Sequence, residues 1–407
     1  MSGVAVRAGG PRRQAHVLTR ASPYEMVLSE LCSALFASLP RRDQRGKGAE
    51  YVRGLLETPG RKSIRNIAAL LGGQAIEQSL HHFINSSTWD WVPVRQALAQ
   101  YLVRIAPPQA WVVRPIVIPK AGEHSVGVGK RFISALGRVQ NAQQAMGVWV
   151  ASDETSSPIN WRLHLSRAWL DDDRRRRQAS IPDGLHSETL GDCAITAYLE
   201  MATRWKLPVR PVVLDARDMD ALAIVQKLRV AGAPLLVRIN STLRLTVEDP
   251  DLPGHSVDAL PAHQILGAVM NRRRPVTWMD HGRVAAMRTS LAATVRVRMP
   301  SSRDQTGHAP GRGALLLGVS ENGQCWPKEL WLTDLMATQP AFLLRLRRLI
   351  HRVDRDFTEI ADRVGIRDFA GRSFDGWHRH VTLASAAHAV AALSIRAVQG
   401  EAGRPGE

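Results

Sequence analysis

Short apolar runs of strand type follow one another from residue 107 to residue 240, first alone and then in alternation with helical segments, and this order constrains the fold most strongly. The runs at 111–118, 125–128, 145–151 and 161–165 predict a meander of strands. Helical segments at 187–205 and 219–231 then alternate with strands at 210–214 and 234–239. This pattern predicts an α/β fold in which a mixed sheet is covered by helices.

Helical spacing on both sides of this region completes the predicted organisation. Apolar residues from Met26 to Leu102 recur at helical intervals and predict an N-terminal bundle of four or five helices. Residues from Leu346 to Val364 form one apolar stripe, which predicts a single helix ended by Gly365. The predicted segments are a disordered tail (1–22), a helical DNA-binding region (23–106), the first part of the core (107–240), a β-rich insertion leaning on the main sheet (241–334), the second part of the core (335–395) and a second disordered tail (396–407).

The charge of the chain favours a negatively charged partner. Its 407 residues include 54 Lys and Arg against 37 Asp and Glu, a formal charge of +17. Because 47 of these cations are Arg, GC-rich codon usage is a second explanation of the positive charge. The clusters of basic residues are therefore better evidence for a partner than the total charge. One such cluster is residues 41–65, with a local charge of +5, and another is residues 272–274 in the predicted insertion. A DNA surface or a solvated face fits both; the candidate DNA-binding residues are Arg41, Arg42, Arg45, Lys47, Arg61, Lys62, Arg272, Arg273 and Arg274.

The sequence does not favour a membrane protein, a disulfide-bonded protein or a zinc-cluster protein. The longest apolar stretch, residues 382–395, is interrupted by His388 and is shorter than the roughly 18 residues that a membrane span needs. The three cysteines lie more than a hundred residues apart without paired spacing. We therefore expect no membrane partner and a cytoplasmic, nucleoid-associated protein.

Several blocks of the chain resemble insertion-sequence transposases of the DDE type, in particular their seven-oh-one subgroup. The resemblance runs in order from about residue 36 to residue 393 and includes several runs of consecutive residues. It is carried by Arg45, Tyr51, Gly54 to Leu56, Arg61 to Ser63, His82, Phe83 and Trp89 to Trp91; by Pro119, Lys120, Gly122, His124 to Val128, Leu136, Gly137, Val139, Asn141 and Gln143; by Trp169, Asp173, Arg175, Arg176 and Pro182; and by Gly371 to Ser373, Gly376 to His378, His380 and Leu383.

This resemblance implies an RNase H-like core that cuts and rejoins double-stranded DNA, with two subunits assembled on paired element ends. Its chemistry rests on three carboxylates that hold two Mg²⁺ ions, one activating the attacking oxygen and the other stabilising the leaving oxygen. Carboxylates are required because Mg²⁺ takes hard oxygen ligands.

The first carboxylate of the family pattern is missing here. The family places an acidic pair four or five residues before the Pro-Lys of Pro119 and Lys120, and those positions hold Pro115 and Arg114. Neither side chain ligates magnesium, and a guanidinium near a divalent ion opposes binding by several kcal/mol, even at an effective dielectric near ~20. Glu123 is an alternative ligand, but it belongs to a turn beyond the strand.

The second and third carboxylates survive in altered settings. Asp215 ends the apolar strand at the family's second position, where it is either a vestigial ligand or the cap of the following helix. Asp354 stands where the family has its Glu, and it reaches about 1.5 Å less, a large difference against metal–oxygen distances near 2.1 Å. Two family basic residues nearby are replaced by Ile350 and Ala361.

The sequence therefore predicts a transposase-family protein with a degenerate triad, in which catalysis is impaired or absent and Mg²⁺ binding is doubtful. Three alternatives remain open at this stage: an active transposase that uses other carboxylates, a non-enzymatic DNA-binding regulator derived from a transposase, and a decaying remnant without a role.

Overall fold

The computed structural model describes residues 22–133, 137–249, 252, 258–282, 285–299, 313–321 and 324–402. The predicted tail at 1–22 lies outside these residues except for Ser22. The predicted tail at 396–407 lies partly within them and differs from the prediction, because the last helix continues to Ala402. Among the described helices, none is both long enough and apolar enough to cross a bilayer.

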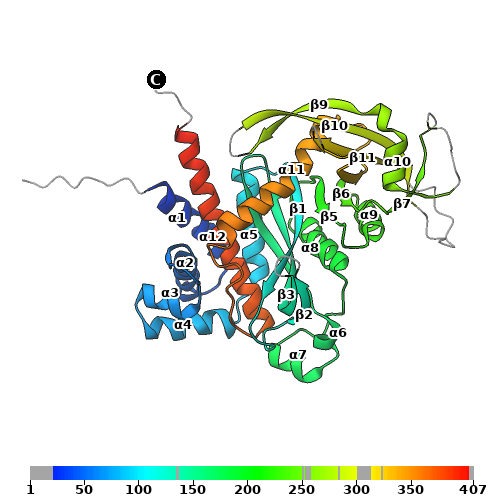
Figure 1. Ribbon diagram of the computed structural model, residues 1–407. Coiled ribbons are helices and arrows are strands. Elements are labelled where there is room, and N and C mark those ends of the chain that lie inside the picture. Colours follow the sequence, from blue (N-terminus) through cyan, green and yellow to red (C-terminus); the bar gives the residue numbers. More distant parts are fainter. Residues whose placement is uncertain are drawn as a thin grey trace, which may run out of the picture.

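Five helices form the N-terminal region (Figure 1), as the helical spacing predicted. Side chains cap three of them, because Ser22, Ser63 and Asp90 each accept a backbone N–H of the first turn. Gly54 allows two helices to approach closely, since a Cβ at this position would lie 2.3 Å from Ile67 Cγ2. The helices are α1 (Pro23–Phe36), α2 (Arg42–Glu57), α3 (Ile64–Leu71), α4 (Gln74–Asn85) and α5 (Trp91–Ile105).

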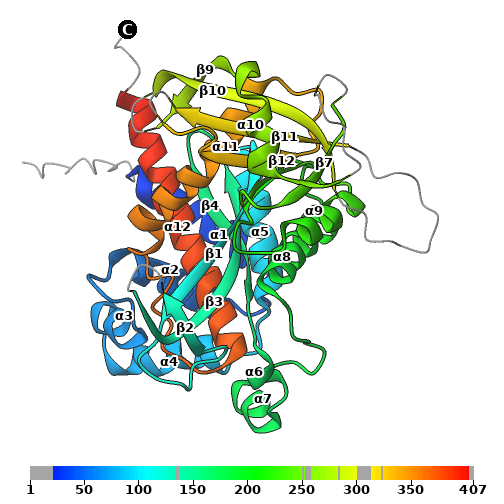
Figure 2. The same cartoon turned by 45° about the vertical axis from the view of Figure 1, so that its right-hand side comes forward.

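A twelve-stranded mixed sheet forms the centre of the described chain (Figure 2). In its first half the order is β4-β3-β1-β5-β6, with antiparallel pairs up to β1 and parallel pairs from β1 to β6, which confirms the predicted RNase H-like mixed sheet. The strands of this half are β1 (Ala110–Pro119), β2 (Gly129–Ile133), β3 (Arg138–Ala151), β4 (Ser156–Leu163), β5 (Val212–Asp215) and β6 (Leu235–Ile239).

The segment predicted as a β-rich insertion extends the same sheet. It joins the core where β12 pairs antiparallel with β6, and the order continues β12-β11-β10-β7-β8 with β9 beside β10. The sequence predicted a piece leaning on the sheet, whereas the structure has one continuous hydrogen-bonded sheet. The strands are β7 (Arg244–Val247), β8 (Leu260–Pro261), β9 (Arg274–His281), β10 (Ala285–Arg298), β11 (Ala314–Glu321) and β12 (Glu329–Thr333).

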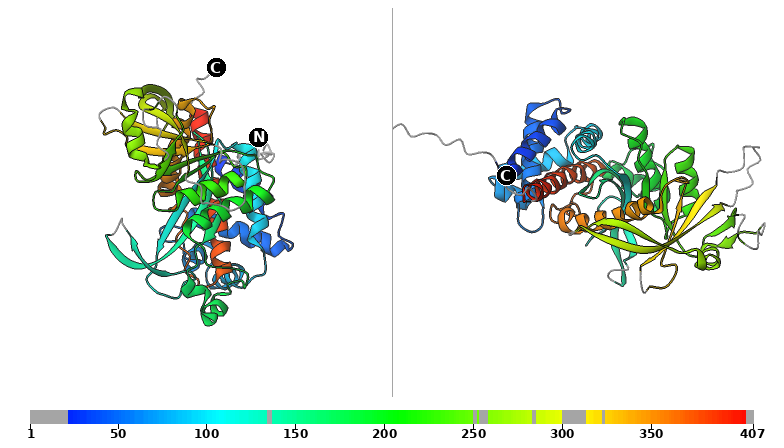
Figure 3. Two further views of the ribbon diagram at one scale, coloured as in Figure 1. Left: turned by 90° about the vertical axis from the view of Figure 1, so that its right-hand side faces the viewer. Right: turned by 90° about the horizontal axis from the view of Figure 1, so that it is seen from above.

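Helices cover both faces of the sheet (Figure 3, right), with α8 and α9 on one side and α11 on the other. This is the arrangement that right-handed crossovers between parallel strands produce. The last helix, α12, packs along the edge strand β4 and against α1, α2 and α5. The remaining helices are α6 (Arg167–Leu170), α7 (Asp173–Ala179), α8 (Leu190–Arg204), α9 (Ala221–Val230), α10 (Ala262–Ala268), a short 3₁₀ turn (Met270–Arg272), α11 (Pro340–Asp356) and α12 (Phe374–Ala402).

The single helix predicted from Leu346 to Val364 is interrupted. Helix α11 ends at Asp356, and a π-helical turn at Phe357–Ala361 follows it. Each side chain of the apolar stripe is buried or partly buried, so the stripe identified the packed side but not the change of helix type. Gly365 does end the segment, at a positive φ of 75° that favours glycine.

Buried polar groups join the helical region to the sheet and to α12. The guanidinium of Arg95 on α5 donates to Asn160 Oδ1 and the carbonyl of Trp161 on β4, and to Thr382 Oγ1 and the carbonyl of His378 on α12. His378 Nδ1 lies 3.0 Å from Arg95 Nη2. His378 is thus buried and held by the Arg95 guanidinium.

Two other buried histidines on α12 make stability depend on pH. His380 lies 2.9 Å from both Tyr51 Oη and the carbonyl of Gly365, and His388 packs edge-on against Trp149. Burial lowers the pKa of each imidazole to about 4. Between about pH 6.5 and about pH 4 the unfolded chain therefore binds protons that the folded chain does not, so stability is complete above this window and is lost as the pH falls through it.

We expect the free energy of unfolding to fall by on the order of 2 kcal/mol for each of these histidines between about pH 7 and about pH 5, as measured by urea titration. His380→Gln or His388→Gln should each make the pH dependence shallower, whereas His81→Gln at an exposed site should not. Equal stability of the wild-type protein at both pH values would contradict this account.

Candidate active site

Arg114 lies in the middle of the sheet, beside the end of β5. Val113 is opposite Leu214 in the parallel pair of β1 and β5, so the next residues along the two strands, Arg114 and Asp215, come side by side. Successive residues of a strand face opposite sides of the sheet. Arg114 points toward α11, while the neighbouring Pro115 is exposed. Of the two residues predicted at the first site position, Arg114 therefore faces α11 and Asp354, and Pro115 does not.

The guanidinium of Arg114 is ion-paired with Asp354 of α11. Its Nε lies 2.7 Å from Asp354 Oδ1, and its Cζ lies 4.0 Å from the centroid of the Phe357 ring. Phe357 belongs to the π-helical turn directly after α11, and Arg367 contacts the same ring at 4.7 Å. The negative charge of Asp354 is thus balanced by a side chain of the chain itself.

Asp215 is held by two other arginines. Arg217 binds both of its carboxylate oxygens, with Nη2 2.8 Å from Oδ2 and Nε 3.0 Å from Oδ1. Arg238 on β6, which is opposite Asp215 in the sheet register, approaches Oδ2 to 3.5 Å. The hydrogen bonds with Asp215 raise the pKa of Arg217 above its ordinary value.

The alternative role of Asp215 as a helix cap is not supported by the structure. The following helix, α9, begins at Ala221, and the side chain of Asp220 accepts its first-turn N–H from Ala223. Asp215 instead accepts the backbone N–H of Arg217 at 3.2 Å, a local turn within its own loop.

The ion pairs continue from Asp215 across the sheet. Arg238 Nη2 lies 3.7 Å from Glu329 Oε1, and Glu329 Oε2 is 2.9 Å from Arg347 Nη1. Burial acts to raise the pKa of Glu329, but Arg347 and Arg238 outweigh it, so the pKa lies below its ordinary value. Asp215 and Glu329, the two carboxylates of this row of charges across the sheet, are therefore each ion-paired with guanidinium groups.

The residues present do not fit a pair of magnesium ions. Mg²⁺ requires near-octahedral oxygen ligation at about 2.1 Å, and here guanidinium nitrogens occupy the space next to both aspartates. A unit positive charge ~4 Å from a divalent ion opposes it by about 8 kcal/mol at an effective dielectric near 20. Within the described part of the chain, no group of three or more His, Cys, Asp or Glu side chains is arranged to hold a metal.

Two other carboxylates do not replace the missing ligand. Glu123 is exposed in the turn beyond the end of β1, and the strand from Arg114 to Pro119 alone spans about 16 Å at 3.3 Å per residue. Asp362, after the π-helical turn, is paired with Arg367 at 3.2 Å. Burial raises the pKa of Asp362, although Arg367 and Arg114 oppose this effect.

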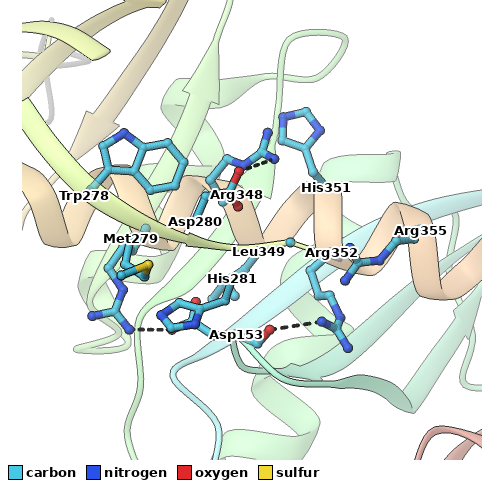
Figure 4. A pocket seen from close by; sticks show the side chains of 12 residues that line it. Asp153, Trp278, Met279, Asp280, His281, Arg348, Leu349, His351, Arg352 and Arg355 are labelled. Atoms are coloured by element: carbon cyan, nitrogen blue, oxygen red, sulfur yellow. Dashed lines mark hydrogen bonds and ion pairs between the residues drawn. The ribbon is translucent and has the colours of Figure 1, made fainter. Parts of the chain in front are cut away.

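A small cavity of about 50 Å³ opens beside the same helix, α11 (Figure 4). Arg348 on its wall lies 3.2 Å from Asp280 of β9, and Arg345 is ion-paired with Asp153. Arg352 donates to the carbonyl of Asp153 and lies 2.8 Å from Asp356. Both aspartates of the lining are thus paired with arginines, so the lining offers no spare carboxylate for a cation.

The candidate DNA-binding residues of the helical region lie mostly at the start of α2. Arg41, Arg42 and Arg45 are exposed there, and Arg61 is exposed in the loop before α3. Lys47 is partly exposed and pairs with Glu50 at 2.6 Å. The exposed members present positive charge to the solvent, as contact with a phosphate backbone requires.

Lys62 does not belong to this set. Its side chain is 5% exposed, and its ammonium group donates to the carbonyl of Thr58. Its backbone N–H donates to Asp368 Oδ2 at 2.7 Å, which ties this loop to the segment before α12. The sequence placed Lys62 on a charged surface, but the structure uses it to connect two parts of the chain.

The second candidate set, Arg272 to Arg274, lies between α10 and β9. Arg272 is ion-paired with Asp249 at 2.9 Å, and Arg273 lies over the ring of Trp326 at 5.5 Å. Arg274 is exposed at the first position of β9. Of the three, Arg274 is exposed, whereas Arg272 and Arg273 are partly buried.

Arg217, Arg238 and Glu329 are the site residues that sequence reasoning missed. Arg217 lies two residues after Asp215, but no sequence motif indicated that it would bind this carboxylate. The β5–β6 pairing places Arg238 beside Asp215, and β12 carries Glu329 into the same row. Only the pairing of strands from distant parts of the chain brings these residues together, and no local motif signals it.

The mixed sheet and its flanking helices define an RNase H-like architecture, and arginines pair with the carboxylates at its centre. A family model described as DDE superfamily endonuclease matches residues 34–304, more than half of the chain. The chain belongs to this family, which confirms the predicted family; the subgroup remains a prediction. The matched region includes Arg114 and Asp215 and ends before Asp354. A search of curated proteins gave no match.

If the arginines exclude a metal ion from this site, replacing Arg114 with a carboxylate and removing the guanidinium of Arg217 should create a metal-binding site. We expect Arg114→Asp/Arg217→Ala to bind Mn²⁺ measurably by titration calorimetry. The new carboxylate at position 114 lies beside Asp215 on the side that faces Asp354, and one guanidinium partner of Asp215 is gone. The matched control, Arg114→Ala/Arg217→Ala, removes the same two cations without adding a ligand. Equal Mn²⁺ binding by the two double variants would show that Arg114 does not occupy a metal position.

Proposed function

We propose that this protein binds double-stranded DNA as a derivative of a DDE transposase and lacks metal-dependent strand cleavage. The observation that carries the proposal is the 2.7 Å ion pair between Arg114 and Asp354, at the positions of the first and third family carboxylates. DDE superfamily endonucleases generally use Mg²⁺ ions. In this chain the same carboxylates have arginine partners, and the site needs no metal for electrostatic balance.

The geometry of these partners supports loss of activity better than reduced activity. Loss of one ligand by a neutral substitution leaves a weakened metal site, but Arg114 adds a positive charge between β1 and α11. Arg217 and Arg238 are ion-paired with Asp215 as well, so both Asp354 and Asp215 have arginine partners. A metal would have to displace three guanidinium groups to assemble the site.

DNA binding is supported by the exposed arginines that take no part in the ion pairs of Asp215 and Asp354. The exposed arginines at the start of α2 and Arg274 at the start of β9 are suited to phosphate contacts, which require no metal. A protein of this kind would act as a regulator or as a binder of element ends. We also propose that it is found with the nucleoid and that it forms a homodimer on paired DNA ends, as the resemblance to transposases implies.

Incubation of supercoiled plasmid with purified protein and Mg²⁺ or Mn²⁺ tests the loss of cleavage. We expect no nicking above the buffer background, because no three carboxylates of the described residues are arranged to hold a metal ion. Asp215→Ala is the control for contaminating nuclease, since it removes a family ligand. Nicking by the wild-type protein that disappears in Asp215→Ala would mean that the chain is an active transposase using other carboxylates.

Salt-dependent DNA affinity tests the binding half of the proposal. Arg41→Ala/Arg42→Ala should lower the slope of log affinity against log salt by about 2, because each lost phosphate contact removes roughly 0.9 from the slope. Arg174→Ala/Arg177→Ala removes two exposed arginines from α7 and should leave the slope unchanged. An equal loss in both double variants would indicate a general effect of charge and not a surface on α2.

A further inference from the structure

The hairpin formed by β2 and the start of β3 extends away from the body of the molecule (Figure 3, left). In its register Lys130 is opposite Asn141 and Phe132 is opposite Val139. Strand β2 is the last strand in the order of the sheet, so its outer edge has no partner among the described strands. The hairpin therefore offers a two-stranded ribbon to the solvent.

The two faces of this ribbon differ. On the inner face, Arg131 Nη2 lies 2.9 Å from His164 Nδ1, which anchors β2 to the loop after β4. On the outer face, the side chains of Phe132 and Val139 are 65% and 59% exposed. An exposed Phe and Val directly across from each other form an apolar patch that the described chain leaves uncovered. Lys130 and Asn141 flank this patch on the same face.

Charge identifies the partner that fits this face. Residues 124–152 contain no Asp or Glu, while Lys130, Arg131 and Arg138 all lie on the hairpin. A second copy of the chain pairing edge to edge would bring the same cations against each other, and lysine on an edge strand opposes such pairing. A nucleic acid backbone carries the complementary charge along its whole length.

We propose that the outer face of the β2–β3 hairpin contacts double-stranded DNA, with the ribbon lying in a groove. The major groove admits a two-stranded ribbon, and each polar residue of the face has a suitable contact there. Lys130 reaches a phosphate, Phe132 and Val139 meet the apolar edges of bases, and the amide of Asn141 is suited to adenine. This inference rests on the proposed DNA-binding function and adds a surface apart from α2 and β9.

Fluorescence anisotropy with a labelled mixed-sequence duplex tests the hairpin. We expect Phe132→Ala to weaken binding ~10-fold and Val139→Ala to weaken it by a smaller factor, because both lose contact with the bases. Lys130→Ala should lower the salt slope by about 1, the effect of one phosphate contact. Val230→Ala and Arg174→Ala, at exposed positions on α9 and α7, are the apolar and charged controls and should bind as the wild-type protein does.

The outcomes separate this inference from the function on which it rests. If the wild-type protein fails to bind duplex DNA, both fall together. If the wild-type protein binds and the three hairpin variants match the two controls, the hairpin is not a DNA surface, while the proposed function stands. Sedimentation of the protein alone provides the remaining check: if Phe132→Ala changes the oligomeric state and not the DNA affinity, the face belongs to an interface between copies.

Discussion

The parallel pairing of β1 with β5 is the constraint on which the centre of this molecule depends. It sets Arg114 beside Asp215 and fixes the side of the sheet from which α11 presents Asp354. Once the backbone holds these positions, the chemistry of the centre follows from the identity of one side chain. A carboxylate at position 114 would repel its neighbours unless a cation joined them, whereas a guanidinium is itself that cation. The charges at the centre of the sheet can therefore balance without a metal ion.

Much of the fold was predictable because its signals are local. The strand runs and the helical stripes each depend on neighbours in sequence, and the mixed sheet followed from their order. The differences arise where tertiary packing decides. The apolar stripe through Phe357 looks continuous in sequence, but the chain takes a π-helical turn there as that ring packs against Arg114 and Arg367. Similarly, β12 extends the main sheet through its pairing with β6, which no local pattern encodes.

The candidate site was predictable only where a motif marked it. Resemblance to the family located Arg114, Asp215 and Asp354, but Arg238 and Glu329 enter the row through strand pairing across long stretches of sequence. The burial of Lys62 could not be predicted from sequence either. It lies in a basic stretch, and yet its ammonium group donates to the carbonyl of Thr58. Charge counted along a chain does not distinguish a cation that faces solvent from one that joins two segments. The cleavage, dimer and DNA-surface interpretations remain predictions.

The buried guanidinium of Arg95 has a consequence for how the polypeptide matures on the ribosome. Its partners His378 and Thr382 follow it by 283 and 287 residues. At roughly 5–20 residues per second, the N-terminal helices emerge on the order of 15–60 s before the final helix that completes their polar contacts. During that interval α5 holds a charged group without its full set of acceptors. Until α12 has been synthesised, water is the remaining source of hydrogen bonds for this guanidinium, because a charged group without partners is costly to bury.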